Sequence, residues 1–135
     1  MTTLATARRV LIVDDNSDAA ETLSMMLEVL GQHTAVAHDG PAALRLAGAF
    51  RPDAAILDIG LPGMNGYELA SAMRKLDGLE SILLIALTGW NDSATRARAY
   101  EAGFDLHLAK PAAVDALTKA LGMGSPARER DRPSA

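Results

Sequence analysis

The 135-residue chain contains no cysteine, which excludes a disulfide framework and any zinc or iron–sulfur site built on thiolates. It also lacks a hydrophobic run near the roughly 20 residues that span a bilayer, since its longest run extends only from Ile82 to Leu87. Residues 1–7 do not have the charged start and apolar stretch of a signal peptide. These absences predict a cytoplasmic protein with no membrane partner.

An excess of positive charge is missing as well. Thirteen Lys and Arg residues stand against seventeen Asp and Glu residues, a formal net charge of −4, and the arginines lie among acids. The sequence therefore has no cluster of basic residues of the kind that binds nucleic acid, and we expect no direct DNA binding.

The length and the 49% hydrophobic content suit one compact domain. We expect this domain over residues 8–122, after a short N-terminal extension at 1–7. Residues 123–135 turn to Gly, Pro, Ser and alternating charge, which predicts a disordered tail. A basic interaction arm is the alternative for this tail, but acidic residues interrupt its arginines.

Five short apolar runs recur along the chain and are continuous rather than alternating. Continuous runs are typical of strands that are buried on both faces of a parallel sheet. The runs cover residues 10–13, 35–37, 54–57, 82–87 and 106–109.

Amphipathic helices are expected between and after these strands, because apolar residues there recur at a spacing of three and four. The first helix should open near Asp18 and stop at Gly31. The fourth, at about residues 93–102, is rich in alanine, with Ala97 and Tyr100 as its clearest apolar face. We expect it to be the least firmly packed. Five alternations of strand and helix predict an α/β fold, a doubly wound five-stranded parallel sheet with five helices.

Chemically active side chains follow four of the predicted strands, at the edge of the sheet where such folds bind ligands. Three carboxylates with backbone oxygens make a site suited to Mg²⁺. An ammonium and a hydroxyl suit a phosphoryl group, and neighbouring glycines (Gly60 and Gly89) let backbone N–H groups approach it closely. Together they suggest phosphoryl transfer onto Asp58. The side chains belong to Asp14, Asp15, Asp58, Thr88 and Lys110.

Each element of this site also has a purely structural interpretation. An Asp-Asp pair after a strand is often a helix-capping turn, Asp58 could begin a loop, and a lysine is usually a solvated charge. Unrelated turns would not, however, place acids, hydroxyl and ammonium after four different strands. The combination therefore favours a functional site.

These residues lie in motifs that resemble the receiver domain of two-component response regulators. The motifs are residues 10–16 (VLIVDDN), residues 57–66 (LDIGLPGMNG), Leu87-Thr88, residues 102–105 (AGFD) and Lys110-Pro111. The resemblance runs from about Arg8 to Gly122. It implies a flavodoxin-like sheet with strand order 2-1-3-4-5.

The resemblance also implies roles for residues. Asp58 would be the phosphoacceptor, served by a phosphohistidine on a histidine kinase or a histidine phosphotransfer protein. Mg²⁺ would be held by Asp15 directly, by Asp14 through water, by Asp58 and by the backbone carbonyl of Gly60. Such a domain is a regulatory module in a two-component system or phosphorelay rather than an enzyme, and it catalyses only its own phosphorylation and dephosphorylation.

Thr88 and Lys110 would hold phosphoryl oxygens, with further contacts from the backbone N–H groups of Gly60 and Gly89. The Lys110-Pro111 peptide bond is expected to be cis, as in the family. The surface at residues 93–121 is expected to pass the signal to a downstream partner.

Several positions depart from the family pattern. His107 stands where receivers usually have Tyr or Phe, and it is either a partly buried core histidine or a switch residue that works with Thr88. Gly60 and Trp90 occupy two positions where many receivers carry polar side chains that influence loss of the phosphoryl group. The segment at residues 103–111, around His107, is similar to the corresponding segment in receivers of hybrid histidine kinases.

Two further histidines, His33 and His38, lie near the second predicted strand. We expect them to be surface residues away from the acidic edge, and not metal ligands.

Three other function classes share part of this pattern. A pseudo-receiver would bind partners without being phosphorylated. A Mg²⁺-dependent phosphohydrolase of the haloacid dehalogenase type would have the motif Asp-x-Asp at its nucleophile. Here Gly60, not an aspartate, stands two residues after Asp58. A flavodoxin needs a Ser/Thr/Gly loop for the flavin phosphate where this chain has acids.

Overall fold

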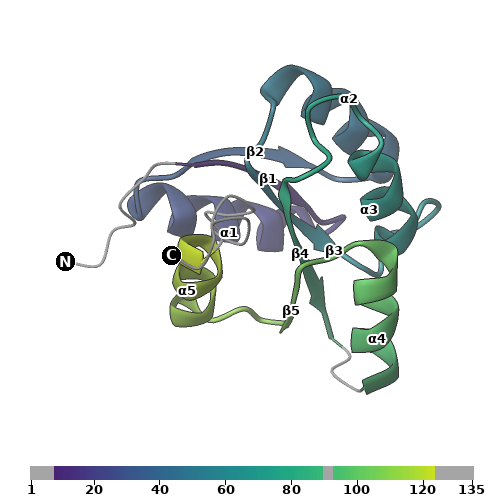
Figure 1. The fold of residues 1–135 in the computed structure, drawn as a ribbon. Helices are drawn as coiled ribbons and strands as arrows, with labels where there is room; N and C mark the ends of the chain where they lie inside the picture. Colours follow the sequence, from purple (N-terminus) through teal and green to yellow (C-terminus); the bar gives the residue numbers. More distant parts are fainter. Residues whose placement is uncertain (1–7, 90–92, 124–135) are drawn as a thin grey trace, which may run out of the picture.

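Five parallel strands form one sheet in the order β2-β1-β3-β4-β5, and helices cover both of its faces (Figure 1). The predicted doubly wound fold is thereby confirmed. The computed structural model describes residues 8–89 and 93–123. The strands are β1 (Arg9–Val13), β2 (His33–Ala37), β3 (Ala54–Asp58), β4 (Leu83–Thr88) and β5 (Leu106–Ala109). The helices are α1 (Ser17–Val29), α2 (Gly40–Phe50), α3 (Gly66–Arg74), α4 (Ser93–Ala102) and α5 (Val114–Met123).

The side chains of the central strands sort alternately onto the two faces of the sheet, as the period of two in a strand requires. Leu11 and Leu57 point to the face that packs against α2, α3 and α4. Ile12 and Ile56 point to the opposite face, which packs against α1 and α5. Figure 1 shows the two groups of helices on either side of the sheet.

The edge strands are less buried than their apolar runs predicted. Every residue of β3 and β4 is buried, as expected, but β2 and β5 are mostly half-buried. An edge strand has a neighbour on one side only, and a continuous apolar run cannot reveal this. β2 also begins earlier than predicted, at the exposed His33.

The first helix begins slightly before the predicted start near Asp18. Asn16 is its N-cap, and the Asn16 side chain accepts a hydrogen bond of 3.0 Å from the N–H of Ala19. Asp18 lies in the first turn, where a negative charge interacts favourably with the helix dipole. Gly31 ends the segment with a φ of +92°, a conformation that glycine adopts without strain.

The prediction for the face of α4 was wrong. Ala99 is the buried residue of this helix, whereas Ala97 is exposed and Tyr100 is 52% exposed. Ala99 packs in one cluster with Ala86 and Phe104. Packing through a methyl group brings the helix close to the sheet and leaves the larger Tyr100 outside.

Three predictions concern residues outside the described part of the chain: the extension at 1–7, the side chain of Trp90, and a tail from 124 onwards. Helix α5 ends at Met123, one residue into the predicted tail. Within the described residues, no helix has both the length and the hydrophobicity needed to cross a bilayer.

Candidate functional site

The carboxylates of Asp14, Asp15 and Asp58 form an acidic cluster at the carboxyl ends of β1 and β3. One carboxylate oxygen of each residue lies within 4.8 Å of the others. Asp14 and Asp58 are buried and Asp15 is exposed. Since β1 and β3 are neighbours, the topology brings together residues more than 40 positions apart in the chain.

Lys110 supplies the positive charge of the site. Its Nζ lies 3.0 Å from Asp58 Oδ2 and 3.6 Å from Asp14 Oδ2. The backbone N–H of Lys110 donates to the carbonyl of Thr88 at 2.8 Å, which continues the pairing of β4 and β5 to the position of this lysine. The following peptide bond, Lys110-Pro111, is cis.

The charges of the site do not balance. Three carboxylates and one ammonium leave two formal negative charges in a partly buried space. Burial raises the pKa of the Asp14 carboxyl above its usual value, and the nearby Asp58 acts in the same direction. The N–H of Asn16 and the charge of Lys110 only partly oppose these effects.

The same surroundings favour the charged form of Lys110, whereas they disfavour the charged form of Asp14. Burial lowers the pKa of its ammonium, but the hydrogen bond to Asp58 and the two carboxylate charges outweigh burial, so the pKa is raised. The lysine is therefore positively charged at neutral pH. An oxygen-only donor set with an excess of two negative charges fits a hard divalent cation such as Mg²⁺.

Asp58 is held from two sides. Its Oδ1 accepts a hydrogen bond of 3.0 Å from the N–H of Gly60, and its Oδ2 faces Lys110. A Cβ at Gly60 would lie 3.7 Å from Asp58 Oδ1, and a Cβ at Gly89 would meet no atom of the described residues within 4 Å. The space around these glycines thus admits a side chain. The close backbone approach that the sequence suggested does not by itself require glycine at these two positions.

The loop after Asp58 is fixed by the start of α3. Asn65 and Glu68 form a reciprocal capping box, with hydrogen bonds of 2.9 and 3.1 Å. The N–H of Gly66 donates to the carbonyl of Ile59 at 3.0 Å, and a Cβ at Gly66 would lie only 2.6 Å from Ile59 Cα. Glycine at 66 permits this close approach, which holds the backbone next to Asp58.

Thr88 ends β4 beside the acidic cluster. It is 3% exposed, and the preceding residue Leu87 pairs with Asp58 across the two strands. The hydroxyl-bearing residue thus lies one position beyond Asp58 at the same edge of the sheet.

His107 lies in β5, opposite Ala86 of β4. Its neighbours Leu106 and Leu108 pack on the α1 and α5 face, so the alternation of the strand directs His107 to the α4 face. Its Nε2 is buried and has no hydrogen-bond partner among residues 8–89 and 93–123. The half-buried position agrees with the core interpretation, and a role in switching stays a prediction.

His38 was wrongly predicted to lie away from the acidic edge. Its Nδ1 is 3.0 Å from the backbone oxygen of Asp14. The strand order gives the reason: β2 is the neighbour of β1, so the residue after β2 lies beside the residue after β1. The strand order 2-1-3-4-5, which the family resemblance implied, would have predicted that His38 lies beside Asp14. His33, at the other end of β2, is exposed as predicted.

A cavity of about 520 Å³ opens next to the site, between α1 and the loop that follows β5. Leu23, Met26 and Leu87 form part of its apolar wall, and Asp14 and Lys110 lie at its polar side. The site is therefore open to a group that approaches along α1.

A family model, the response regulator receiver domain, matches residues 10–122 of the chain. Two curated relatives are regulators of Mycobacterium tuberculosis. The transcriptional regulatory protein PrrA is 39% identical over 111 residues, which cover 82% of this chain and 47% of PrrA. The DNA-binding response regulator MtrA is 38% identical over 104 residues, which cover 77% of this chain and 44% of MtrA. The chain thus spans about half the length of these relatives.

Solved structures agree with this match. The Vibrio cholerae chemotaxis protein CheY4 superposes with a TM-score of 0.83 at 28% identity, over 87% of this chain and 98% of the other. The receiver domain of the sensor histidine kinase PA1611 from Pseudomonas aeruginosa superposes with a TM-score of 0.79 at 30% identity, over 87% and 97% of the two chains. That structure holds a magnesium ion in its active-site cleft.

Proposed function

The chain belongs to the response regulator receiver domain family, and from this premise we propose that it accepts a phosphoryl group on Asp58 from a phosphohistidine. One observation carries the proposal: the Asp58 carboxylate lies in the acidic cluster, held between the Lys110 ammonium at 3.0 Å and the Gly60 N–H at 3.0 Å. The donor is a histidine kinase or a histidine phosphotransfer protein.

The proposed step makes one bond and breaks one. An oxygen of the Asp58 carboxylate forms a P–O bond while the P–N bond of the phosphohistidine breaks. The leaving imidazole carries a proton on its other ring nitrogen, takes the electron pair of the broken bond and departs as a neutral ring. Asp58 then carries an acyl phosphate, and no other reactant is consumed.

Positioning and charge neutralisation account for most of the catalysis of phosphoryl transfer. Lys110 offsets negative charge that gathers beside Asp58, and Thr88 offers a hydroxyl from the next strand. Backbone N–H groups of Gly60 and Gly89 are assigned as further contacts to phosphoryl oxygens.

We assign a Mg²⁺ site to Asp15, to Asp14 through water, to Asp58 and to the backbone carbonyl of Gly60. The fit rests on the all-oxygen donor set and on the two uncompensated negative charges of the site. When bound, the ion supplies positive charge between the carboxylates and the phosphoryl oxygens.

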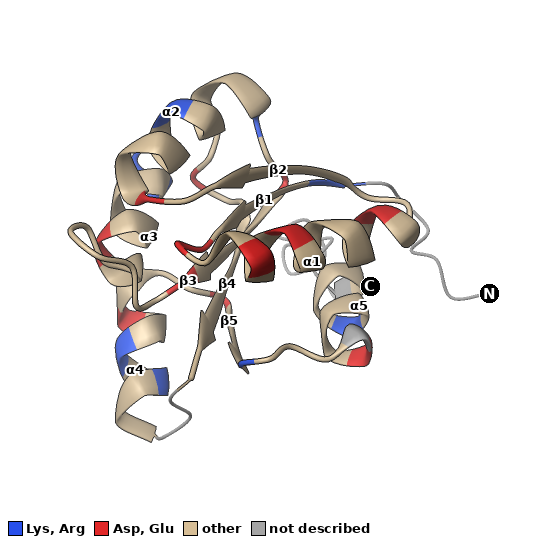
Figure 2. Ribbon diagram, turned by 180° about the vertical axis from the view of Figure 1, so that it is seen from behind, with Lys and Arg blue, Asp and Glu red and all other residues tan. Residues whose placement is uncertain are grey.

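Residues 93–121, which include α4, β5 and most of α5, are proposed as the surface that a downstream protein binds. Of the residues of α4, all of which the structure describes, only Ala99 is buried. Tyr100 of this helix is exposed. Basic residues lie along α4 and acidic residues along α1 (Figure 2). A helix that is held by few buried contacts shifts at low cost, which suits a signalling element.

The cytoplasmic location stays a prediction.

Phosphotransfer from autophosphorylated kinases tests the function. Each purified histidine kinase of the source organism is labelled with radioactive ATP and mixed with the chain in Mg²⁺. Label should move to the wild-type chain but not to Asp58→Asn, and hydroxylamine should release it, as it does for an acyl phosphate.

Two outcomes would favour the rival functions. If no kinase and no small phosphodonor labels the chain, the pseudo-receiver describes it better. If the chain steadily releases phosphate from a generic phosphate ester, it is a phosphohydrolase.

A further inference from the structure

Both backbone polar groups of Asp14 contact the end of β2 and the residue that follows it. The N–H of Asp14 donates to the carbonyl of Ala37 at 3.2 Å, and His38 Nδ1 lies 3.0 Å from the carbonyl oxygen of Asp14. A carbonyl oxygen only accepts, so the contact requires a proton on Nδ1 of His38. Figure 1 shows β1 and β2 side by side, as the order of the sheet requires.

The carbonyl that His38 contacts belongs to the peptide group that joins Asp14 to Asp15. This group is planar, so a bond to its oxygen also fixes the direction of the Asp15 N–H. Two backbone rotations, ψ of Asp14 and φ of Asp15, flank the plane and set the directions of the two Cα–Cβ bonds relative to it. The His38 hydrogen bond therefore acts on the relative placement of the two carboxylates.

The two carboxylates differ in how they are otherwise restrained. Asp14 Oδ1 accepts from the N–H of Asn16 at 3.0 Å, and Asp14 Oδ2 lies 3.6 Å from Lys110. Asp14 is also buried, whereas Asp15 is exposed. The placement of Asp15 thus depends more on the backbone that carries it, and His38 restrains that backbone.

We propose that His38 is a positioning residue for the metal site: its Nδ1–H···O bond fixes the Asp14–Asp15 peptide plane so that both carboxylates face the same cation. This inference rests on the proposed function for its consequence, Mg²⁺ binding, but not for the geometry of the peptide plane itself. The contacts that orient metal ligands from outside typically change metal affinity by about 10- to 100-fold.

Three variants separate positioning from a general effect on β2. His38→Ala removes the donor. His38→Asn keeps an N–H donor at a similar distance from the backbone and should rescue the contact. His33→Ala is the matched control, because His33 is an exposed histidine at the other end of the same strand.

The first readout needs no metal. In nitrogen-edited NMR spectra of the metal-free protein, the Asp15 amide signal should move in His38→Ala, stay close to its wild-type position in His38→Asn, and not move in His33→Ala. An unmoved Asp15 amide in His38→Ala would overturn the inference whether or not the protein binds Mg²⁺.

The second readout is Mg²⁺ affinity, measured by calorimetric titration. We expect about tenfold weaker binding in His38→Ala, the lower end of the usual range because His38 is near the surface. His38→Asn should recover most of it. Equal affinity in wild type and His38→Ala, or an equal loss in His33→Ala, would contradict the inference. A wild-type chain that binds no Mg²⁺ would instead contradict the proposed function, and the amide signal would then decide the positioning role alone.

Discussion

The ammonium nitrogen of Lys110 lies 3.0 Å from Asp58 Oδ2, and it reaches Asp14 Oδ2 at 3.6 Å. Lys110 follows β5, while the two acids end or follow strands in the middle of the sheet. One lysine thus faces both buried carboxylates of the site. In the metal-free protein, the folded state depends on this counter-charge.

Replacement of Lys110 by Met should therefore destabilise the metal-free protein by about 2 kcal/mol, since two buried carboxylates lose their counter-charge and the pair is only partly exposed. Urea denaturation at pH 7 measures the loss, and millimolar Mg²⁺ should recover part of it. Lys119→Met, at an exposed lysine of α5, is the control. If Lys110→Met and wild type unfolded at the same midpoint urea concentration, the counter-charge of Lys110 would not stabilise the fold.

Asp14→Asn should stabilise the metal-free protein at pH 7 and weaken Mg²⁺ binding. Burial raises the pKa of Asp14 above its ordinary value of 3.8, so its ionisation opposes folding. The cost is absent well below pH 3.8, grows between pH 3.8 and the raised pKa of the folded state, and is complete above that raised pKa. The gain in unfolding free energy should thus vanish towards pH 3.8.

Unfolding curves over this pH range give the comparison. Asp18→Asn is the control, because Asp18 is an exposed acid in the first turn of α1 and its loss should not stabilise the protein. A neutral or destabilising effect of Asp14→Asn at pH 7 would argue against an ionisation cost at this site.

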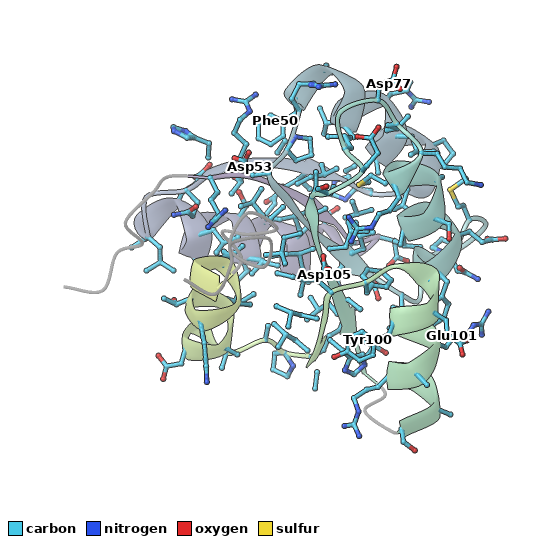
Figure 3. The ribbon with its side chains drawn as sticks, in the orientation of Figure 1. Phe50, Asp53, Asp77, Tyr100, Glu101 and Asp105 are labelled. Carbon is cyan, nitrogen blue, oxygen red and sulfur yellow. The ribbon has the colours of Figure 1, made fainter. Side chains whose placement is uncertain are left out.

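Arg74 anchors the C-terminal end of α4 to α3. Its guanidinium donates to the carbonyls of Glu80, Ile82 and Gly103 and to the Asp105 carboxylate, over 2.6 to 3.2 Å. Figure 3 labels Asp105 between α4 and β5. Arg74→Met should cost about 2–3 kcal/mol of unfolding free energy, because several half-buried acceptors lose their donor.

Chemical denaturation of Arg74→Met and of Lys75→Met, an exposed neighbour, checks this role. Similar stability of the two variants would show that the Arg74 hydrogen bonds contribute little.

Phosphorylation should change hydrogen-exchange protection within residues 93–121. The anchored end of α4 restrains its position, but Ala99 is its only buried residue, so few contacts oppose a shift. Exchange is compared with and without a phosphoryl mimic, in wild type and in Asp58→Asn. Protection changes confined to residues 39–50 would contradict the proposal that residues 93–121 carry the signal.

The sequence was sufficient to predict the strands and the acidic cluster. Continuous apolar runs mark β3 and β4 because both strands are buried on both faces, and the carboxyl-end rule then joins Asp14 to Asp58. These features depend on local patterns and on one general rule of the fold.

Features that depend on how one particular side chain packs or pairs with another element were not predicted. The buried face of α4 is set by the distance at which Ala99 packs on the sheet, which the composition of the helix does not encode. His38 reaches Asp14 only because β2 is next to β1. Within the part of the chain that the structure describes, the buried Nε2 of His107 has no hydrogen-bond partner, and this too depends on what packs around β5 rather than on the sequence of β5.

Direct chemical phosphorylation tests the central claim. The purified chain is incubated with acetyl phosphate in Mg²⁺ or in chelator, and the adduct is measured by intact-mass spectrometry and located in peptides after borohydride reduction. Wild type and the control Asp77→Asn, at an exposed acid, should gain one phosphoryl group in Mg²⁺ and none in chelator, and Asp58→Asn should gain none. An adduct on Asp58→Asn, an adduct formed equally in chelator, or an adduct located at another residue would contradict the assignment of Asp58 as the phosphoacceptor.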